Sequence, residues 1–418
     1  MRETSVIEIN LAAVSQNVQL LKRIIGSNCL LCPIVKADAY GLGAVRVAKT
    51  LLSSGADMLA VYTAAQAAEL MRGAISGSIL VLSPVREVER VDDLYRGLIC
   101  GRLHLTVHDE GHLNDLIILA ERYGAPIPVH LEVDTGMTRG GCAIEDAPRL
   151  LRRIALHPRL NLAGLFTHFA NAESDVEFTD RQLALFDDLI DRCKADIPTS
   201  CLIHAASTFA TLRSNRFHKS MVRVGLAWAG YGMEEIDGGE VIAEGQHLQP
   251  CVTWRSHIVQ LRSIHAGTHV GYGSRWTALR DSVIALVPVG YADGYPVRAG
   301  RVDEGGKTSS VAVLARSSSG GTAVPRFAPV VGAVNMDQIT VDVTDVVADC
   351  AVAVGTEVEL ITPDSSAPNH LPRLADCGGT FAHDMLCRLN PRLKRHYTMN
   401  ATSGEQIIAP RAVAVRAV

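Results

Sequence analysis

Residues 103–134 read LHLTVHDEGHLNDLIILAERYGAPIPVHLEVD and contain a complete strand–helix–strand unit. Both ends are short apolar runs typical of buried strands, while the middle is amphipathic and ends at Gly124, a residue type that commonly terminates helices. Two strands joined by a helix in this way are expected to pair in parallel.

The same alternation extends in both directions along the chain. The first helical pattern is LAAVSQNVQLLKRII, with Asn10 as its N-cap. Eight strands, each with a partnering helix, predict an α/β fold of the (β/α)8 TIM-barrel type. The strand candidates are residues 30–38, 58–62, 78–83, 103–109, 127–134, 162–169, 199–207 and 221–228.

Beyond about residue 250 the pattern changes to short β runs separated by Gly, Pro and Asp clusters. This predicts a second, mainly β domain at the C-terminal end, joined by the N-terminal strand. We expect the barrel to span residues 10–245 and the second domain to span 1–9 and 246–418. Residues 298–325 contain GG and SSSGG clusters, which favour an exposed loop or an extended hairpin.

The composition excludes several classes of partner. The 418 residues are 48% hydrophobic and 20% charged, with a net charge of -4, so no basic surface for nucleic acid is expected. No basic segment followed by an apolar one opens the chain, and no window of about 18 apolar residues occurs, so we expect a cytoplasmic protein without membrane contact. The ten cysteines, including the CxxC of Cys29 and Cys32, are expected to be reduced thiols and not zinc ligands.

Polar residues gather where the predicted barrel strands end. In a barrel these carboxyl ends form the active-site rim, whereas the strands themselves are nearly all apolar. One such residue is commonly structural, but several on one rim indicate a functional site. They are Lys36, Tyr40, Arg139, His168, His204, Ser207, Thr208, Arg223 and Gly225.

Lys36 is the most informative of these residues. It ends an apolar strand and precedes a Gly-rich turn, in VKADAYGLG. A lysine stem can simply reach out to solvent from such a place, but a desolvated ammonium has a lowered pKa and suits Schiff-base chemistry. Phosphate groups bind near strands seven and eight of such barrels, where Ser207, Thr208, Gly225 and Leu226 fall.

These residues lie in segments that resemble the alanine racemases, which are pyridoxal-phosphate (PLP) enzymes of fold type III. The matching segments cover residues 5–390 and include VKADAYGLG, VHLEVDTGMTRGG, GLFTHFANAE, HAASTFATLR and MVRVGLAWAG in the barrel. GYADGYP and VGAVNMDQITVDVTD match the second domain, which simple PLP barrels lack.

The resemblance implies a role for each residue. Lys36 forms the Schiff base with PLP, and Tyr40, Thr208 and the amides of Gly225 and Leu226 hold the phosphate, with Ser207 beside them. Arg139 contacts the phenolic oxygen and the substrate, His168 packs along the ring, and Arg223, supported by His204, faces the pyridine nitrogen. Tyr272 is the second catalytic base, while Tyr291, Met336 and Asp337 lie on the substrate side. Tyr272, Met336 and Asp337 reach the site from a partner subunit, so the resemblance implies a head-to-tail homodimer.

Two bases explain racemisation, because one removes the α-proton from one face and the other returns a proton on the opposite face. A phenol is a poor base at neutral pH, but Arg223 and its histidine neighbours would favour the phenolate of Tyr272. An arginine at the ring nitrogen keeps its own proton, which leaves PLP a weak electron sink and suppresses transamination.

Four positions depart from the family pattern. Glu132 stands where many relatives have a carbamylated lysine, so we expect it to pair with Arg139 without needing CO2. Ser207 and Thr208 replace the usual Asn-Ser. His383, in GGTFAHDMLCRLNPR, replaces a tyrosine that contacts the phosphate, and Ala333 replaces an arginine at the entrance.

The resemblance implies interconversion of L- and D-alanine, but His383 and Ala333 leave alternatives open. These are a racemase of a larger or polar amino acid such as serine, and another fold-type III reaction such as aldol cleavage or decarboxylation. Tyr272 argues against the second group, since those reactions need no symmetric pair of bases. It also argues against a non-catalytic PLP carrier.

Overall fold

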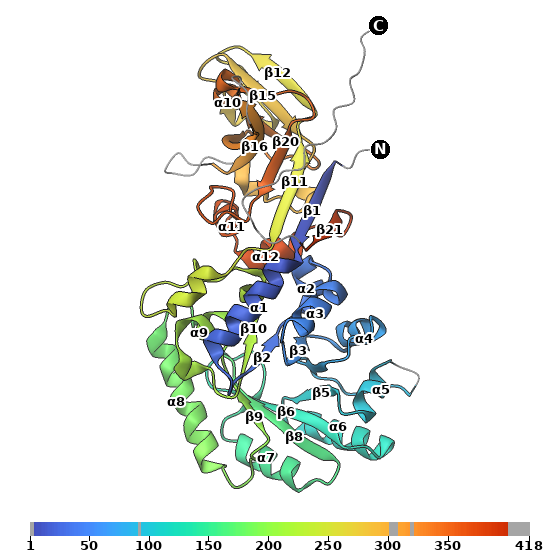
Figure 1. Cartoon of the computed structure of the whole chain (residues 1–418). Helices are drawn as coiled ribbons and strands as arrows, with labels where there is room; N and C mark the ends of the chain where they lie inside the picture. The colour runs from blue at the N-terminus through green and yellow to red at the C-terminus, as the bar shows by residue number, and fades with distance from the viewer. Residues whose placement is uncertain (1–3, 91–92, 301–307, 318–321, 400–418) are drawn as a thin grey trace.

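The computed structural model describes residues 4–90, 93–300, 308–317 and 322–399. Figure 1 shows two parts, a barrel formed by the first half of the chain and a smaller, mainly β domain formed by the second half. The predicted architecture, a (β/α)8 barrel with a mainly β C-terminal domain, is confirmed.

All eight predicted barrel strands are present and parallel. Their order around the barrel is β2-β10-β9-β8-β6-β5-β4-β3. A single bridge between Ile34 and Ala60 closes the barrel between the first and last of these strands, two residues before Lys36. The strands are β2 (Leu30–Pro33), β3 (Met58–Val61), β4 (Ser78–Val81), β5 (Leu103–Val107), β6 (Ile127–Asp134), β8 (Leu160–Phe166), β9 (Leu202–His204) and β10 (Met221–Val224).

Helices cover the outside of the barrel. Asn10 caps the first of them as predicted, because its side-chain oxygen accepts hydrogen bonds from the amides of Ala12 and Ala13 at 3.0 and 3.2 Å. Gly124 ends α6 with a φ of 63°, as predicted. The helices are α1 (Leu11–Ile25), α3 (Ala44–Ser53), α4 (Ala64–Arg72), α5 (Asp93–Ile99), α6 (Glu110–Tyr123), α7 (Ala147–Leu156), α8 (Val176–Arg192) and α9 (Thr208–Arg213).

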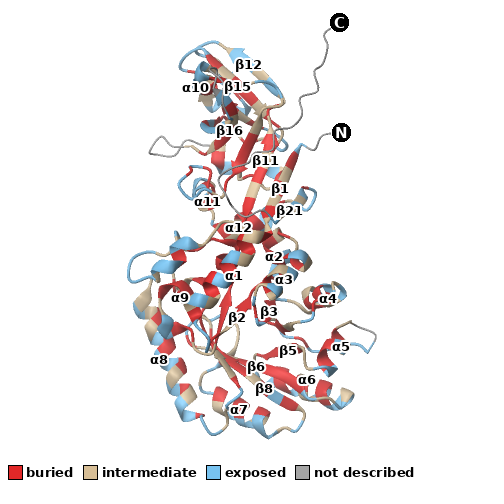
Figure 2. Ribbon diagram, viewed as in Figure 1, coloured by how far each residue is buried: buried red, intermediate tan, exposed pale blue. Residues whose placement is uncertain are grey.

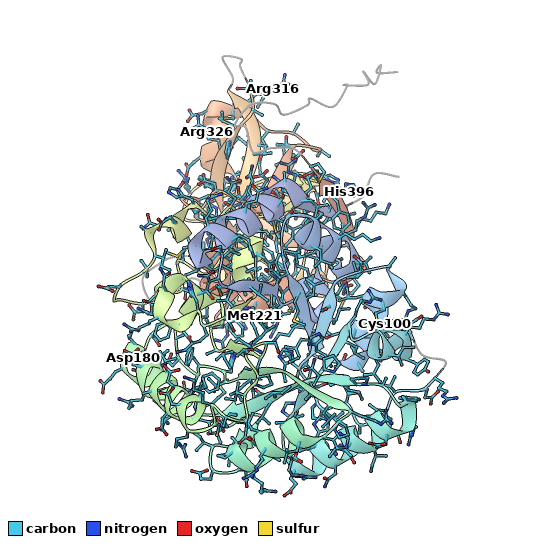
Figure 3. All side chains as sticks on the ribbon, turned by 60° about the horizontal axis from the view of Figure 1, so that its bottom comes forward. Cys100, Asp180, Met221, Arg316, Arg326 and His396 are labelled. Carbon is cyan, nitrogen blue, oxygen red and sulfur yellow. The ribbon has the colours of Figure 1, made fainter. Side chains whose placement is uncertain are left out.

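The barrel strands are buried on both faces, as their apolar sequences require (Figure 2). All four residues of β3 and of β10 are buried. The polar exceptions inside the barrel are therefore informative, and they include His130, His204 and Arg223. Met221, the first residue of β10, is fully buried, and Figure 3 labels it.

The second domain is built on one large sheet, with strand order β12-β15-β18-β17-β16-β20-β11-β1-β21. The first strand of the chain, β1 (Ser5–Asn10), lies in this sheet, antiparallel to β11 (Val252–His257) and parallel to β21 (Lys394–Thr398). The other strands are β12 (Gln260–Ile264), β15 (Ser282–Val287), β16 (Ser310–Ser317), β17 (Val324–Val331), β18 (Ile339–Asp342) and β20 (Glu357–Ile361). Three helices accompany them, α10 (Thr344–Asp349), α11 (Leu371–Cys377) and α12 (Ala382–Arg388).

The segment 298–325 was predicted to be a loop or an extended hairpin. Its described part includes β16 and the start of β17, which form an antiparallel pair. Arg316 and Arg326 lie near the outer end of this pair (Figure 3). Residues 301–307 and 318–321, which hold the GG and SSSGG clusters, lie outside the described residues.

No helix in the described ranges is long and apolar enough to cross a membrane. All ten cysteines are free thiols, seven of them buried.

Candidate active site

A pocket of about 900 Å³ opens at the carboxyl ends of the barrel strands. Most of the barrel residues predicted from the sequence line it. They are Lys36, Tyr40, Glu132, Arg139, His168, Ser207, Thr208, Arg223 and Gly225, joined by His383 from helix α12 of the second domain, more than 300 residues after Lys36 in the chain. His204 and Leu226 are fully buried close to this wall.

Lys36 lies where strand β2 turns out of the barrel, and its side chain is open to solvent through the pocket. Burial by the barrel wall, followed by the neighbouring Arg139 guanidinium, lowers the pKa of Lys36. A lowered pKa makes the neutral amine, which is both nucleophile and base, more accessible near neutral pH.

Four consecutive residues after Lys36 have left-handed backbone conformations. Ala37, Asp38, Ala39 and Tyr40 have φ values of 52° to 58°, although none is glycine. Left-handed turns of this length are disfavoured for L-residues by about 1–2 kcal/mol per residue. The turn brings Tyr40 back into the barrel, where it stacks on Trp228 with ring centroids 5.7 Å apart.

Tyr40, Thr208 and Gly225 form a polar cradle in the pocket wall. A Cβ atom on Gly225 would lie 2.5 Å from the Tyr40 hydroxyl and 3.6 Å from His383 Nε2, so only glycine leaves this space open. The Thr208 hydroxyl accepts a hydrogen bond of 2.9 Å from the Gly225 amide. Burial raises the pKa of Tyr40, so its hydroxyl remains a donor. Two hydroxyls beside a space that excludes a Cβ suit a phosphate group.

Arg223 lies across the back of the pocket and is buried. Its guanidinium donates to His204 Nδ1 at 2.6 Å, to His168 Nδ1 at 3.0 Å and to the Thr167 carbonyl oxygen at 2.9 Å. Burial lowers the pKa of Arg223 to about 10, so it still carries its charge at neutral pH. Burial and the Arg223 charge hold the pKa of His168 well below its usual range, which keeps that ring neutral.

Glu132 does not have the partner expected from the sequence. Its carboxylate pairs with His108 Nδ1 at 3.1 Å, both side chains being largely buried. Arg139 lies in the exposed loop after β6 and makes no ion pair with any residue that the structure describes. His108 reaches Glu132 because β5 and β6 are neighbours and both side chains stand at their carboxyl ends.

Apart from His383, the residues predicted in the second domain do not line this pocket. Tyr272 is 77% exposed, and Tyr291 and Met336 are also exposed. Tyr291 and Met336 lie together, since the Tyr291 and Ala292 amides bond to the carbonyls of Asn335 and Met336. Asp337 pairs with Arg392 at 2.9 Å. Ala333 lines a separate cavity of about 580 Å³ in the second domain.

Some pocket residues were missed from the sequence. Phe166 and His108 belong to the same strand ends that identified their neighbours, in GLFTHF and LHLTVHD, so their position was a usable signal. Tyr62 ends the predicted strand 58–62 and carried the same signal, whereas Glu173 lies in a loop and had no such signal.

Comparison with known proteins gives the same family for both parts of the chain. Residues 9–233 match the family model for the alanine racemase N-terminal domain, and residues 251–397 match the model for its C-terminal domain. The chain is 33% identical over 394 residues to alanine racemase from Halothermothrix orenii, covering 93% of this chain and 96% of that one.

Solved structures agree with the sequence matches. Alanine racemase from Streptomyces lavendulae superposes with a TM-score of 0.81 at 25% identity, covering 96% of this chain and 98% of that one. Alanine racemase from Bartonella henselae with covalently bound PLP superposes with a TM-score of 0.75 at 24% identity, covering 95% and 100%.

Proposed function

Because this chain belongs to the alanine racemase family and is a PLP-dependent amino-acid racemase of that type, we propose that it interconverts L- and D-alanine with two bases, Lys36 and the partner subunit's Tyr272. The observation that carries the proposal is Lys36, an amine of lowered pKa at the rim of a pocket that Arg223 and the polar cradle also line.

The pocket residues fit PLP. Lys36 would hold its aldehyde carbon, and the hydroxyls of Tyr40, Ser207 and Thr208 would bind its phosphate with the Leu226 amide. Arg223 and Arg139 would bind its ring nitrogen and phenolic oxygen. His168 and His383 complete the pocket wall. When bound, PLP supplies an electron-withdrawing ring that acidifies the α-hydrogen of an attached amino acid.

The chain's own groups would then move the proton. Neutral Lys36 Nζ accepts the α-proton on one face, and the Tyr272 hydroxyl of the partner serves the other face. Arg223 keeps its proton, with a pKa of about 10, so it binds without acting as an acid. Its buried guanidinium, held in place by the hydrogen bonds of Nη1 and Nη2, supports the view that it positions the ring and does not transfer a proton.

The distribution of these residues supports a homodimer. Within one chain, Tyr272 stands outside the barrel pocket, so a second copy is needed to bring a tyrosine to Lys36. Tyr272, Met336 and Phe381 are each more than half exposed, as expected of residues that an assembled partner covers. Tyr291, Met336 and Asp337 would contact the substrate side of the partner's site.

A mixing experiment tests both the reaction and the shared site. Lys36→Ala and Tyr272→Phe homodimers should each be nearly inactive in a chiral assay with L- or D-alanine. After subunit exchange, about half of the dimers are mixed and one of their two sites is intact, so about a quarter of wild-type activity should return. Active wild-type enzyme without recovery in the mixture would show that the site is not shared.

A second candidate is a racemase of a larger or polar amino acid such as serine. His383 favours it, because its ring packs 5.4 Å from Tyr40 and lines the pocket. Burial, and then Lys36, lower the pKa of His383 to about 4, so the neutral ring can donate or accept a hydrogen bond. Values of kcat/KM for a panel of amino acids distinguish this candidate from an alanine racemase. A preference for serine over alanine would favour it.

A further inference from the structure

Arg223 is the first member of a chain of hydrogen-bonded side chains that crosses the barrel interior. Its Nη1 donates to His204 Nδ1 at 2.6 Å. His204 Nε2 lies 2.9 Å from His130 Nδ1, and His130 Nε2 lies 2.9 Å from His104 Nδ1. The four residues come from β10, β9, β6 and β5, and we call the three imidazoles the histidine relay.

The relay must pass strand β8, which lies between β6 and β9. The residue of β8 opposite His130 is Gly164. A Cβ atom there would lie 2.1 Å from His130 Nδ1, so the imidazole occupies the space that any other side chain would fill. The sequence thus provides both the histidines and the gap that lets two of them meet.

The relay has one direction. A guanidinium only donates hydrogen bonds, so His204 must accept at Nδ1 and, when neutral, carry its proton on Nε2. Burial holds the pKa of His130 and of His204 well below the usual range and lowers that of His104 to about 4, so all three rings are neutral near pH 7. Each ring therefore accepts from the Arg223 side and donates away from it, ending in a hydrogen bond from His104 to the Gly101 backbone.

The histidine relay holds the buried Arg223 charge in place without a carboxylate. Arg223 is buried, yet in the described part of the chain its hydrogen-bond partners are imidazoles and backbone carbonyls, with no carboxylate in contact. A carboxylate would fix the guanidinium but also neutralise it. Neutral imidazole acceptors fix its position and leave its positive charge available to a group in the pocket.

We propose that His130 and His104 are positioning residues for the reaction, which hold His204 in one tautomer and through it fix Arg223 against the cofactor. The proposal rests on the proposed function, in which Arg223 binds the PLP ring. Without His130 as acceptor, the His204 Nε2–H is left unpaired in the barrel, and the ring is free to turn or change tautomer. Arg223 then loses its shortest hydrogen bond.

Three variants interrupt the relay in different ways. Gly164→Ala removes no hydrogen-bonding group but displaces His130, His130→Leu removes the central ring, and His104→Leu removes the last acceptor. His104→Asn is the conservative variant, because its Oδ1 can accept from His130 Nε2 in place of Nδ1. His218→Leu is the matched control, since His218 is also buried and bonds the Thr211 carbonyl, outside the relay.

Each variant is measured for kcat and KM with alanine, for the dissociation constant of PLP, and for the absorption band of bound PLP. Interrupted variants should lose about tenfold in kcat and in PLP affinity, the effect of one unpaired buried donor, with a shifted band and little change in the KM for alanine. His104→Asn should stay within about twofold of wild type, and His218→Leu should keep its kcat and band.

The outcomes separate the two proposals. Wild-type enzyme that binds PLP but does not racemise alanine contradicts the proposed function, while PLP affinity and the absorption band still report on the relay. Active wild-type enzyme with Gly164→Ala and His104→Leu unchanged in kcat, affinity and band would overturn the relay. Equal losses in His104→Asn and His104→Leu would also overturn it. If His130→Leu fails to fold, the other two variants decide.

Discussion

Glu132 places its carboxylate beside the pocket, 3.1 Å from His108 Nδ1. We predict that removing CO2 and bicarbonate leaves activity unchanged, because the carboxylate is part of the side chain. Activity in CO2-depleted buffer, with and without added bicarbonate, measures this. Glu132→Gln should lower kcat/KM by about tenfold, the equivalent of one charged hydrogen bond of about 1.5 kcal/mol, and bicarbonate should not restore it. A bicarbonate requirement in the unaltered enzyme would contradict the prediction.

Tyr272 can be tested as a base by isotope exchange. Racemisation has an equilibrium constant of one, so losing one base slows net conversion equally in both directions. In D2O, however, Tyr272→Phe should still let Lys36 remove and return the α-hydrogen on its own face. We expect one enantiomer, and not the other, to gain deuterium without inversion, as followed by NMR and chiral chromatography. Equal exchange of both enantiomers would contradict the two-base assignment.

The turn at 37–40 stores backbone strain next to the reactive amine. Ala37 is exposed and has a φ of 52°, so Ala37→Gly should relieve strain without losing packing. We predict that the free energy of unfolding stays the same or rises by up to about 1 kcal/mol. The control is Ala65→Gly, at an exposed position within α4, which should destabilise by about 0.5–1 kcal/mol. Denaturant titration compares them, and a larger loss at Ala37 would show that the turn is unstrained.

The barrel strands could be located from the sequence, but most of their ends could not. The alternation of strands and helices predicted all eight barrel strands, but all except 127–134 were predicted to run past their observed ends. The largest excesses are at 30–38, which is a strand only to Pro33, at 199–207, a strand only at Leu202–His204, and at 221–228, a strand only to Val224. The apolar residues after these strand ends continue into the pocket wall. They are buried there, but they are not hydrogen-bonded as part of a strand. The left-handed turn at residues 37–40 was not predicted, because it contains no glycine.

The sequence likewise predicted some parts of the candidate site and missed others. Strand ends and the family resemblance found the pocket residues, since both depend on position along the chain. The partner of Glu132 was not found, because which side chain reaches it depends on the neighbouring strand. Gly164 was overlooked for a similar reason, since its importance lies in the ring of His130 across the ladder.

The whole molecule buries several neutral histidines, and this couples its stability to pH. Burial lowers the pKa of His104 and of His383 to about 4, below the value near 6.5 of an unfolded chain. Between these pH values the unfolded chain binds protons that the folded chain excludes, so the free energy of unfolding should fall as pH drops from about 6.5 to about 4. Urea titrations across this range measure the slope.

His104→Asn provides the control for this pH dependence, because it removes one of the responsible rings. Its pH slope should be smaller than that of wild type by the contribution of one proton. A free energy of unfolding that is flat between pH 6.5 and 4, or one that rises on acidification, would contradict the assignment of these rings as neutral.

The position of β1 has a consequence for how the protein is made. Residues 5–10 are synthesised before their neighbours in the sheet, which are residues 252–257 and 394–398. The barrel can therefore begin to form during synthesis while its leading strand waits, with unpaired backbone groups, for nearly the whole chain to emerge. The final docking of β1 is therefore expected to be a late, slow step of folding.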